Sequence, residues 1–245
     1  HVEMQLRYDF RESMCLEDNA HSDILREYDF KQLTAQELLP AKSTKVSILC
    51  VTNRATRYVQ LAVEQAYRQS YRPLQLVVVQ NVAPVDEESI ETLQTRQYLR
   101  DCASKSSQLF EVTPIFVVRT ESPFHTLGGL RNIGVAKSVG DYVVVWDDDD
   151  LYHRERVEKQ VHAIEVSKSC VASTFSSLTV CEVSHKRRKY QLPKREQTGW
   201  EPSLCCRTCD IGKYPLLNTG EDTPVLEALR GRIHVIDDDE SYIYI

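Results

Sequence analysis

Four consecutive aspartates, Asp147 to Asp150, are the residues of this sequence best suited to chemistry. They directly follow residues 142–146 (YVVVW), whose length and β-branched composition predict a buried strand. Carboxylate oxygens suit Mg²⁺ or Mn²⁺, and such sites often combine one or two carboxylates with substrate phosphates. The carboxyl end of a strand in an open α/β sheet is also a usual ligand site. The pattern predicts a divalent-metal site that holds a phosphorylated ligand, with a solvated acidic turn as the alternative.

Strand and helix patterns alternate before this motif. Strands are predicted over 46–51, 74–79 and 115–118, and helices over 58–69, 86–109 and 130–138. This alternation is typical of right-handed crossovers in a parallel sheet. After the motif we expect a helix over 154–168, antiparallel strands within 170–190, a helix that starts near Asp222 and ends at Gly231, and a strand over 233–236.

The first 44 residues differ in character from the rest. They are polar and acidic, with apolar residues at helix-like spacing, and they predict a helical N-terminal extension. Residues 45–245 are expected to form one domain, with a first half over 45–150 and a second over 151–245. The extension is expected to pack on that domain or to form an oligomer contact.

Composition limits the classes of partner. A formal net charge of −6 over 245 residues disfavours broad binding to nucleic acid, and no apolar run has transmembrane length. The eight cysteines lack the paired spacing of a secreted protein, which favours a reducing, cytoplasmic location. Cys206 and Cys209 form one C-x-x-C without the second pair that a structural zinc site needs. A basic run at 186–189 leaves peripheral membrane association open.

Three segments in order resemble glycosyltransferase family 2. They are VSILCVTNR at 46–54, RNIGVAKSVGDYVVVWDDDD at 131–150 and GEDTPVLEAL at 220–229. The resemblance covers roughly residues 45–245. It implies an inverting glycosyltransferase with a GT-A fold, a Rossmann-like α/β architecture in which helices flank a mixed, mainly parallel sheet. Residues 45–150 would bind the nucleotide, and residues 151–245 the acceptor.

The resemblance also implies the residues of a donor site. Asp149 would be the main ligand of Mn²⁺ or Mg²⁺. Asp147 would bind the donor ribose or reach the metal through water, and Asp148 would lie beside them in the donor site. Arg131 would approach the donor diphosphate. Thr52, Asn53 and Arg54 would line the nucleotide pocket.

On the acceptor side, the resemblance implies that Asp222 is the general base, with Glu221 as its helper, and that Trp200 forms part of the acceptor wall. The residues themselves leave simpler alternatives open. Asp222 is equally suited to cap the following helix, and Trp200 to pack in the core. Arg131 is equally suited to a surface salt bridge.

The sequence departs from the family pattern after the second strand, where the family often has an aspartate and this chain has Gln80-Asn81. An asparagine both donates and accepts hydrogen bonds, so Asn81 can still read a base. The donor is therefore left as a UDP-, GDP- or dTDP-sugar, and the acceptor as a glycan, a polysaccharide or a glycolipid. Two other functions are weighed: a non-catalytic sugar-nucleotide-binding domain, and a phosphotransferase with an aspartate nucleophile, which Leu151 after the fourth aspartate fits poorly.

Overall fold

The computed structural model describes residues 44–182, 188–238 and 241–244. Residues 1–43 of the predicted extension over 1–44 lie outside this part of the chain, as does the 183–187 segment that contains the start of the basic run. The described residues belong to one compact unit, Pro40–Ile245. Among them, no helix combines the length and the apolarity that crossing a bilayer requires.

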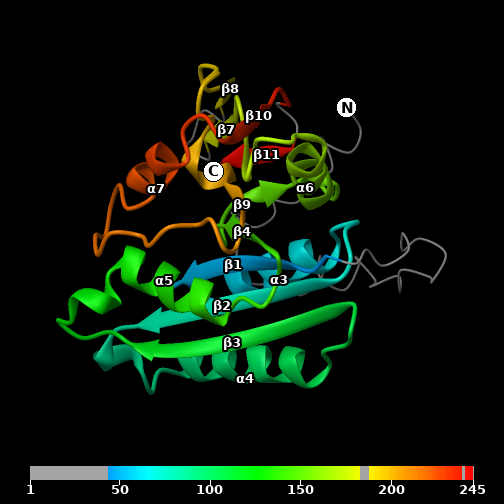
Figure 1. Cartoon of the computed structure of the whole chain (residues 1–245). Helices are drawn as coiled ribbons and strands as arrows, with labels where there is room; N and C mark the ends of the chain where they lie inside the picture. Colours follow the sequence, from blue (N-terminus) through cyan, green and yellow to red (C-terminus); the bar gives the residue numbers. More distant parts are fainter. Residues whose placement is uncertain (1–43, 183–187, 239–240, 245) are drawn as a thin grey trace. The chain divides into compact units, whose positions relative to one another are not determined.

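A seven-stranded sheet forms the centre of this unit, in the order β10-β6-β9-β4-β1-β2-β3 (Figure 1). β1 lies between β2 and β4 and is parallel to both, with Thr52 opposite Gln80 and Cys50 opposite Trp146. This register places the carboxyl ends of β1, β2 and β4 at one edge. The strands are β1 (Val46–Thr52), β2 (Leu74–Val82), β3 (Phe110–Val118), β4 (Tyr142–Trp146), β6 (Ala172–Phe175), β9 (Cys205–Arg207) and β10 (Ile233–Ile236).

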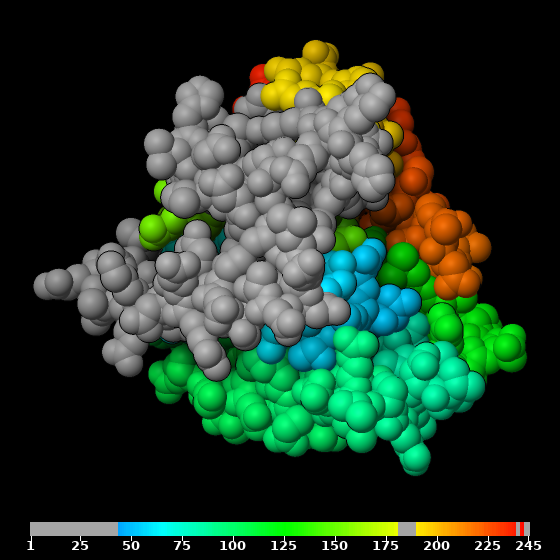
Figure 2. Space-filling view, turned by 180° about the vertical axis from the view of Figure 1, so that it is seen from behind, coloured from blue at the N-terminus to red at the C-terminus, as the bar shows by residue number. Residues whose placement is uncertain are grey.

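Helices cover both faces of this sheet. α5 (Leu127–Lys137) packs on one face, where Leu130 meets Leu49, Val77 and Val143. α3 (Thr56–Tyr67), α4 (Ile90–Ser104) and α6 (Arg156–Val166) bury their apolar residues in a larger core against the opposite face. Figure 2 shows the molecule from behind, where the α4 segment lies along the lower margin. Since both faces are covered, β1, β2 and β4 carry nearly continuous apolar sequence.

A second, four-stranded sheet in the order β5-β11-β7-β8 adjoins the aspartate motif. It contains β5 (Leu151–Tyr152), β7 (Thr179–Glu182), β8 (Arg188–Gln191) and β11 (Tyr242–Tyr244). The antiparallel pairing of β7 with β8 confirms the hairpin expected within 170–190. α7 (Thr223–Ala228) follows Asp222, as its sequence predicts.

The structure corrects two details of the sequence interpretation. The helix expected over 86–109 is shorter, because residues 84–86 form a 3-10 turn and α4 spans only Ile90–Ser104. β3 is an edge strand, which explains how it accommodates Pro114. β9 was not expected as a strand; it runs antiparallel between β4 and β6 and makes the sheet mixed.

Candidate active site

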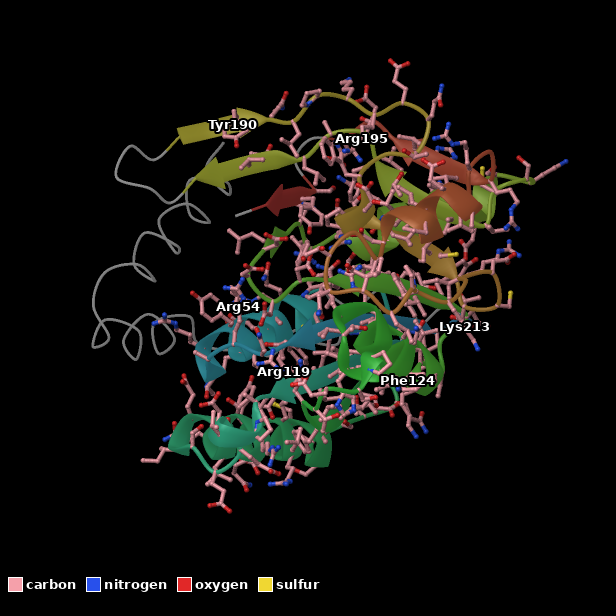
Figure 3. The ribbon with its side chains drawn as sticks, turned by 90° about the vertical axis from the view of Figure 1, so that its left-hand side faces the viewer. Arg54, Arg119, Phe124, Tyr190, Arg195 and Lys213 are labelled. Atoms are coloured by element: carbon pink, nitrogen blue, oxygen red, sulfur yellow. The ribbon has the colours of Figure 1, made fainter. Side chains whose placement is uncertain are left out.

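The carboxyl ends of β1 and β4 open onto a cavity of about 160 Å³. In Figure 1, β1, β2 and β3 point to the left, and Figure 3 views the molecule from that side. The carboxyl edge of the sheet, where Arg54 is labelled, therefore faces the reader in Figure 3. The polar residues that line the cavity are Thr52, Asn53, Arg54, Arg131, Asp147, Asp148 and Asp149. All seven were predicted as donor or metal residues, so the structure brings the predicted donor-side residues together, with the exception of Asn81.

Asp148 and Asp149 bind the turn that follows β1. The Thr52 hydroxyl donates a short hydrogen bond to Asp148, and the Arg54 guanidinium lies 3.4 Å from the same carboxylate. A second Arg54 nitrogen lies 2.7 Å from Asp149 Oδ2. Burial raises the pKa of Asp148 to about 6, and the neighbouring charges of Asp149 and Asp147 act in the same direction. One partly exposed arginine therefore serves two carboxylates, so negative charge accumulates at this edge.

Arg131 is a buried cation shared by three carboxylates. Its guanidinium nitrogens lie 3.2 Å from Glu221 Oε1, 3.8 Å from Asp222 Oδ2 and 3.9 Å from Asp147 Oδ1. Burial acts to lower the pKa of Arg131, but the carboxylates outweigh it and the pKa is raised. The alternative of a surface salt bridge is wrong, because only 7% of this side chain is exposed.

Glu221 and Asp222 occupy different environments although they are adjacent. Glu221 is 2% exposed, and burial raises its pKa against the opposing charge of Arg131. The Asp222 side chain is 22% exposed. Asp222 stands at the cap position of α7, but its side chain accepts no capping hydrogen bond. Glu221 is therefore suited to hold Arg131, and the more open Asp222 carboxylate is left for a ligand.

Tyrosines beneath the aspartate motif are the part of the site that the sequence interpretation missed. The Tyr242 hydroxyl donates to Asp150 Oδ2 at 2.7 Å and lies 3.5 Å from Asp147 Oδ2. The Tyr152 hydroxyl accepts from the Asp147 backbone N–H at 2.8 Å. Asp150 is 1% exposed, so the fourth aspartate anchors the turn and does not face the cavity. The Tyr-rich segment at 241–244 was the available signal.

Asn81 and Trp200 lie apart from this cavity. Asn81 is the last residue but one of β2 and is 8% exposed, and neither its Oδ1 nor Gln80 Oε1 has a hydrogen-bond partner among the described residues. Trp200 packs partly buried against the core, and its indole N–H donates to the Pro193 carbonyl. The Arg195 guanidinium covers its ring at 3.7 Å (Figure 3 labels Arg195). Most of the contacts of the Trp200 ring are therefore explained by core packing, and its contact with an acceptor remains a prediction.

The carboxylates of the aspartate motif fit a divalent cation only if a bound phosphate or water supplies the remaining oxygen ligands. Within the described residues, no three His, Cys, Asp or Glu side chains converge as a ready metal site. Asp147 and Asp149 supply hard oxygens, and burial raises the pKa of Asp147 because its charged form loses solvation. Mg²⁺-type sites normally complete their shell with water and phosphate oxygens. Arg54 would have to release Asp149 when a cation binds.

Comparisons with known proteins identify the family and the fold. A family model described as glycosyl transferase family 2 matches residues 47–217. Similar solved structures include Staphylococcus aureus TarS (19% identity, TM-score 0.58) and its 1–349 fragment in complex with UDP (21%, 0.54). A mannosyltransferase from Pyrobaculum calidifontis, in complex with GDP-Man and Mn2+, is also similar (17%, 0.54).

These likenesses cover most of the present chain but only part of each solved structure. The alignments span 82%, 81% and 84% of this chain and 36%, 60% and 59% of TarS, the TarS fragment and the mannosyltransferase, respectively. At such identities they establish the GT-A fold alone. No curated protein matches the chain by sequence at a significant level.

Proposed function

The chain belongs to glycosyl transferase family 2, and we propose that it is a metal-dependent, inverting glycosyltransferase that uses a nucleotide-sugar donor. One observation carries the proposal: an aspartate motif, a buried arginine and a more open carboxylate converge at the carboxyl edge of the sheet. Asp147–Asp149, Arg131 and Asp222 are these groups.

The donor diphosphate would lie between Arg131 and the aspartate motif. Loss of a nucleoside diphosphate places growing negative charge on the β-phosphate, and a preorganised guanidinium stabilises that charge. Arg131 is fixed for this role by Glu221 and by the face of the Tyr214 ring, whose centroid lies 5.4 Å from the guanidinium carbon. Thr52, Asn53 and Arg54 would hold the nucleoside end of the donor.

Asp147 and Asp149 would hold Mn²⁺ or Mg²⁺. Asp148 would lie beside them and accept the hydrogen bond from the Thr52 hydroxyl. When bound, the cation supplies Lewis-acid stabilisation of the leaving diphosphate. The similar mannosyltransferase is in complex with GDP-Man and Mn2+, which supports a divalent cation as the cofactor.

Asp222 would take the proton from the acceptor hydroxyl, which is a poor nucleophile until a base does so. Attack from the face opposite the leaving group inverts the anomeric centre and needs no protein nucleophile. Glu221 supports Asp222 indirectly, because it neutralises Arg131. Trp200 is proposed as part of the acceptor wall, since the carboxylate of adjacent Glu201 lies 3.5 Å from Thr223 Oγ1 at the start of α7.

The complexes with UDP and GDP-Man in the similar structures support a UDP- or GDP-sugar as donor, and a dTDP-sugar remains to be tested. The acceptor is proposed to be a glycan, a polysaccharide or a glycolipid. Asn81 is proposed to read the base in place of the usual aspartate. Family membership removes the support for a phosphotransferase with an aspartate nucleophile. A reducing, cytoplasmic location is proposed from the unpaired spacing of the cysteines in the sequence.

A thermal-shift screen of UDP-, GDP-, dTDP- and CMP-sugars, each with and without Mn²⁺, tests donor use. A ligand that binds only the folded state raises the melting temperature as its concentration exceeds Kd. We expect one nucleotide class to stabilise the protein in a Mn²⁺-dependent way. Failure of every donor to do so would contradict the proposal.

An Asp222→Asn variant tests the chemistry of the identified donor. Calorimetry should give an unchanged donor Kd, and turnover should fall by about 10²–10⁴-fold, as for loss of a general base. Equal loss of binding and turnover would instead make Asp222 a structural residue. Unchanged turnover with intact donor binding would show that Asp222 is not the base, whereas donor binding without turnover in the wild type itself would favour the non-catalytic binding domain.

A further inference from the structure

Two hydrogen bonds between a side-chain amide of α5 and the loop backbone hold the loop that precedes Asp222. Asn132 Nδ2 donates to the Tyr214 carbonyl at 2.8 Å, and the Tyr214 backbone N–H donates to Asn132 Oδ1 at 2.9 Å. One side-chain amide thus satisfies both backbone groups of a residue 82 positions away. The 211–222 loop then leads from Tyr214 to Glu221 and Asp222.

A second contact, one turn earlier on α5, fixes the middle of the same loop. The Gly128 backbone N–H donates to the Leu217 carbonyl at 3.0 Å, and the Leu127 N–H donates to Asn218 Oδ1 at 3.1 Å. A Cβ atom added at Gly128 would lie 1.9 Å from the Pro215 carbonyl oxygen. Only glycine allows the helix and the loop to approach this closely.

The same helix carries the proposed diphosphate ligand. Arg131 precedes Asn132, and its guanidinium lies between the ring of Tyr214 and the carboxylates of Glu221 and Asp222. Tyr214 is 2% exposed, so it is a buried anchor between the helix and the loop. One short stretch of α5 therefore sets the position of the donor-side cation and of the acceptor-side carboxylate.

We propose that Asn132 and Gly128 are positioning residues that fix Asp222 relative to a diphosphate held by Arg131. This inference rests on the proposed function and deepens it. Neither residue lines the cavity, so their effect passes through the loop and falls on the transfer step. Misplacement of a reacting group by about 1 Å costs on the order of 10²-fold in rate. Donor affinity should be independent of this contact.

The test compares Asn132→Ala and Gly128→Ala with two matched controls. Gln75→Ala removes a buried amide that makes four hydrogen bonds near the amino ends of β1 and β2, away from the cavity. Gly212→Ala adds a methyl group to the same loop, where nothing lies within 4 Å of it. Each variant is assayed for donor Kd by calorimetry and for nucleoside diphosphate release, with water as the acceptor. The donor is the one identified by the thermal-shift screen.

We expect Asn132→Ala and Gly128→Ala to keep the donor Kd and to lose about 10–100-fold in kcat. Gln75→Ala and Gly212→Ala should retain wild-type kcat, even where Gln75→Ala melts at a lower temperature. A kcat loss in Gln75→Ala equal to that in Asn132→Ala would overturn the inference, because destabilisation alone would then explain both. A wild-type kcat in Asn132→Ala would also overturn it.

Amide hydrogen exchange gives a readout that does not depend on turnover. Loss of the Asn132 amide should speed exchange at the backbone amides of 217–222, beyond the directly affected Tyr214. Faster exchange at Tyr214 alone would refute a positioning role. If the wild-type protein shows no turnover with any donor, the proposed function fails, and exchange at 217–222 still decides whether Asn132 fixes the loop.

Discussion

Removal of the Arg131 guanidinium should leave the buried Glu221 carboxylate without its counter-charge. The cost in folding stability can be calculated from the structure. Glu221 Oε1 lies 3.2 Å from an Arg131 nitrogen, and Glu221 is 2% exposed. At an effective dielectric constant of about 20, two unit charges at that distance attract by about 5 kcal/mol. Breaking one partner of such a buried pair typically costs about 3–5 kcal/mol. We expect Arg131→Met to lower the free energy of unfolding by that amount.

A double-mutant cycle isolates this interaction. Arg131→Met, Glu221→Gln and the double variant are unfolded in urea and followed by far-UV circular dichroism, with linear extrapolation to water. Glu221→Gln should recover about 2–3 kcal/mol in the Arg131→Met background, near the upper end of couplings between residues in contact. The exposed pair Arg230–Glu227, with 2.6 Å between its charged atoms, is the control and should show little coupling.

The pH dependence has a defined sign. Burial raises the pKa of Glu221 in the folded protein, and loss of Arg131 should raise it further. The folded state then binds more protons than the unfolded state above pH 4.5, so stability falls as the pH rises through that window. The deficit of Arg131→Met should be larger at pH 8 than at pH 4.5. A coupling no greater than that of Arg230–Glu227, or a deficit independent of pH, would refute the reasoning.

Three further predictions address the rest of the site and the core. Asp149→Ala should abolish Mn²⁺-dependent nucleotide binding in calorimetry, whereas the exposed α4 variant Asp101→Ala should bind as the wild type does; equal binding by both would contradict the metal assignment. Tyr242→Phe removes the 2.7 Å bond to Asp150 and should cost about 1–3 kcal/mol in urea unfolding, because a buried acceptor loses a partner; no change in stability would show that the tyrosine does not anchor the aspartate turn. Burial raises the pKa of Glu64 against the charge of Arg68, so its ionisation opposes folding above pH 4.5. Glu64→Gln should therefore stabilise the protein at pH 7 more than at pH 4, and a loss of stability at pH 7 would mean that the Arg68 ion pair prevails.

Local patterns located the aspartate motif at the end of a strand, and the family resemblance supplied the other donor-side residues. The β-branched run of apolar residues before Asp147 predicts a buried strand, and the polar turn after β1 reaches the same edge because parallel strands align their carboxyl ends. The order of strands and helices through residue 146 followed from the same periodicity. The 3.2 Å contact of Arg131 with Glu221 was not foreseen, since it depends on a loop that returns from 90 positions later.

Tertiary pairing decided what the sequence left open. β9 has three residues, Cys205–Arg207, and its strand conformation depends on the backbones of β4 and β6 on either side. The role of Asn132 is equally hidden, because an amide that pairs with a distant backbone leaves no periodic signal. The side chains of Lys159 and Ser241 bind the Asp238 carboxylate at 2.6 and 2.8 Å, and the contact with Lys159 joins segments that no local pattern links.

The most direct test of a cation-assisted diphosphate site is a crystal structure of this chain with Mn²⁺ and the nucleotide selected by the thermal-shift screen, with manganese located by its anomalous signal. We predict a manganese peak bonded to Asp149, and the diphosphate between that peak and the Arg131 guanidinium. A metal and a nucleotide that are both well ordered elsewhere on the protein, with residues 147–149 free of either, would contradict the account.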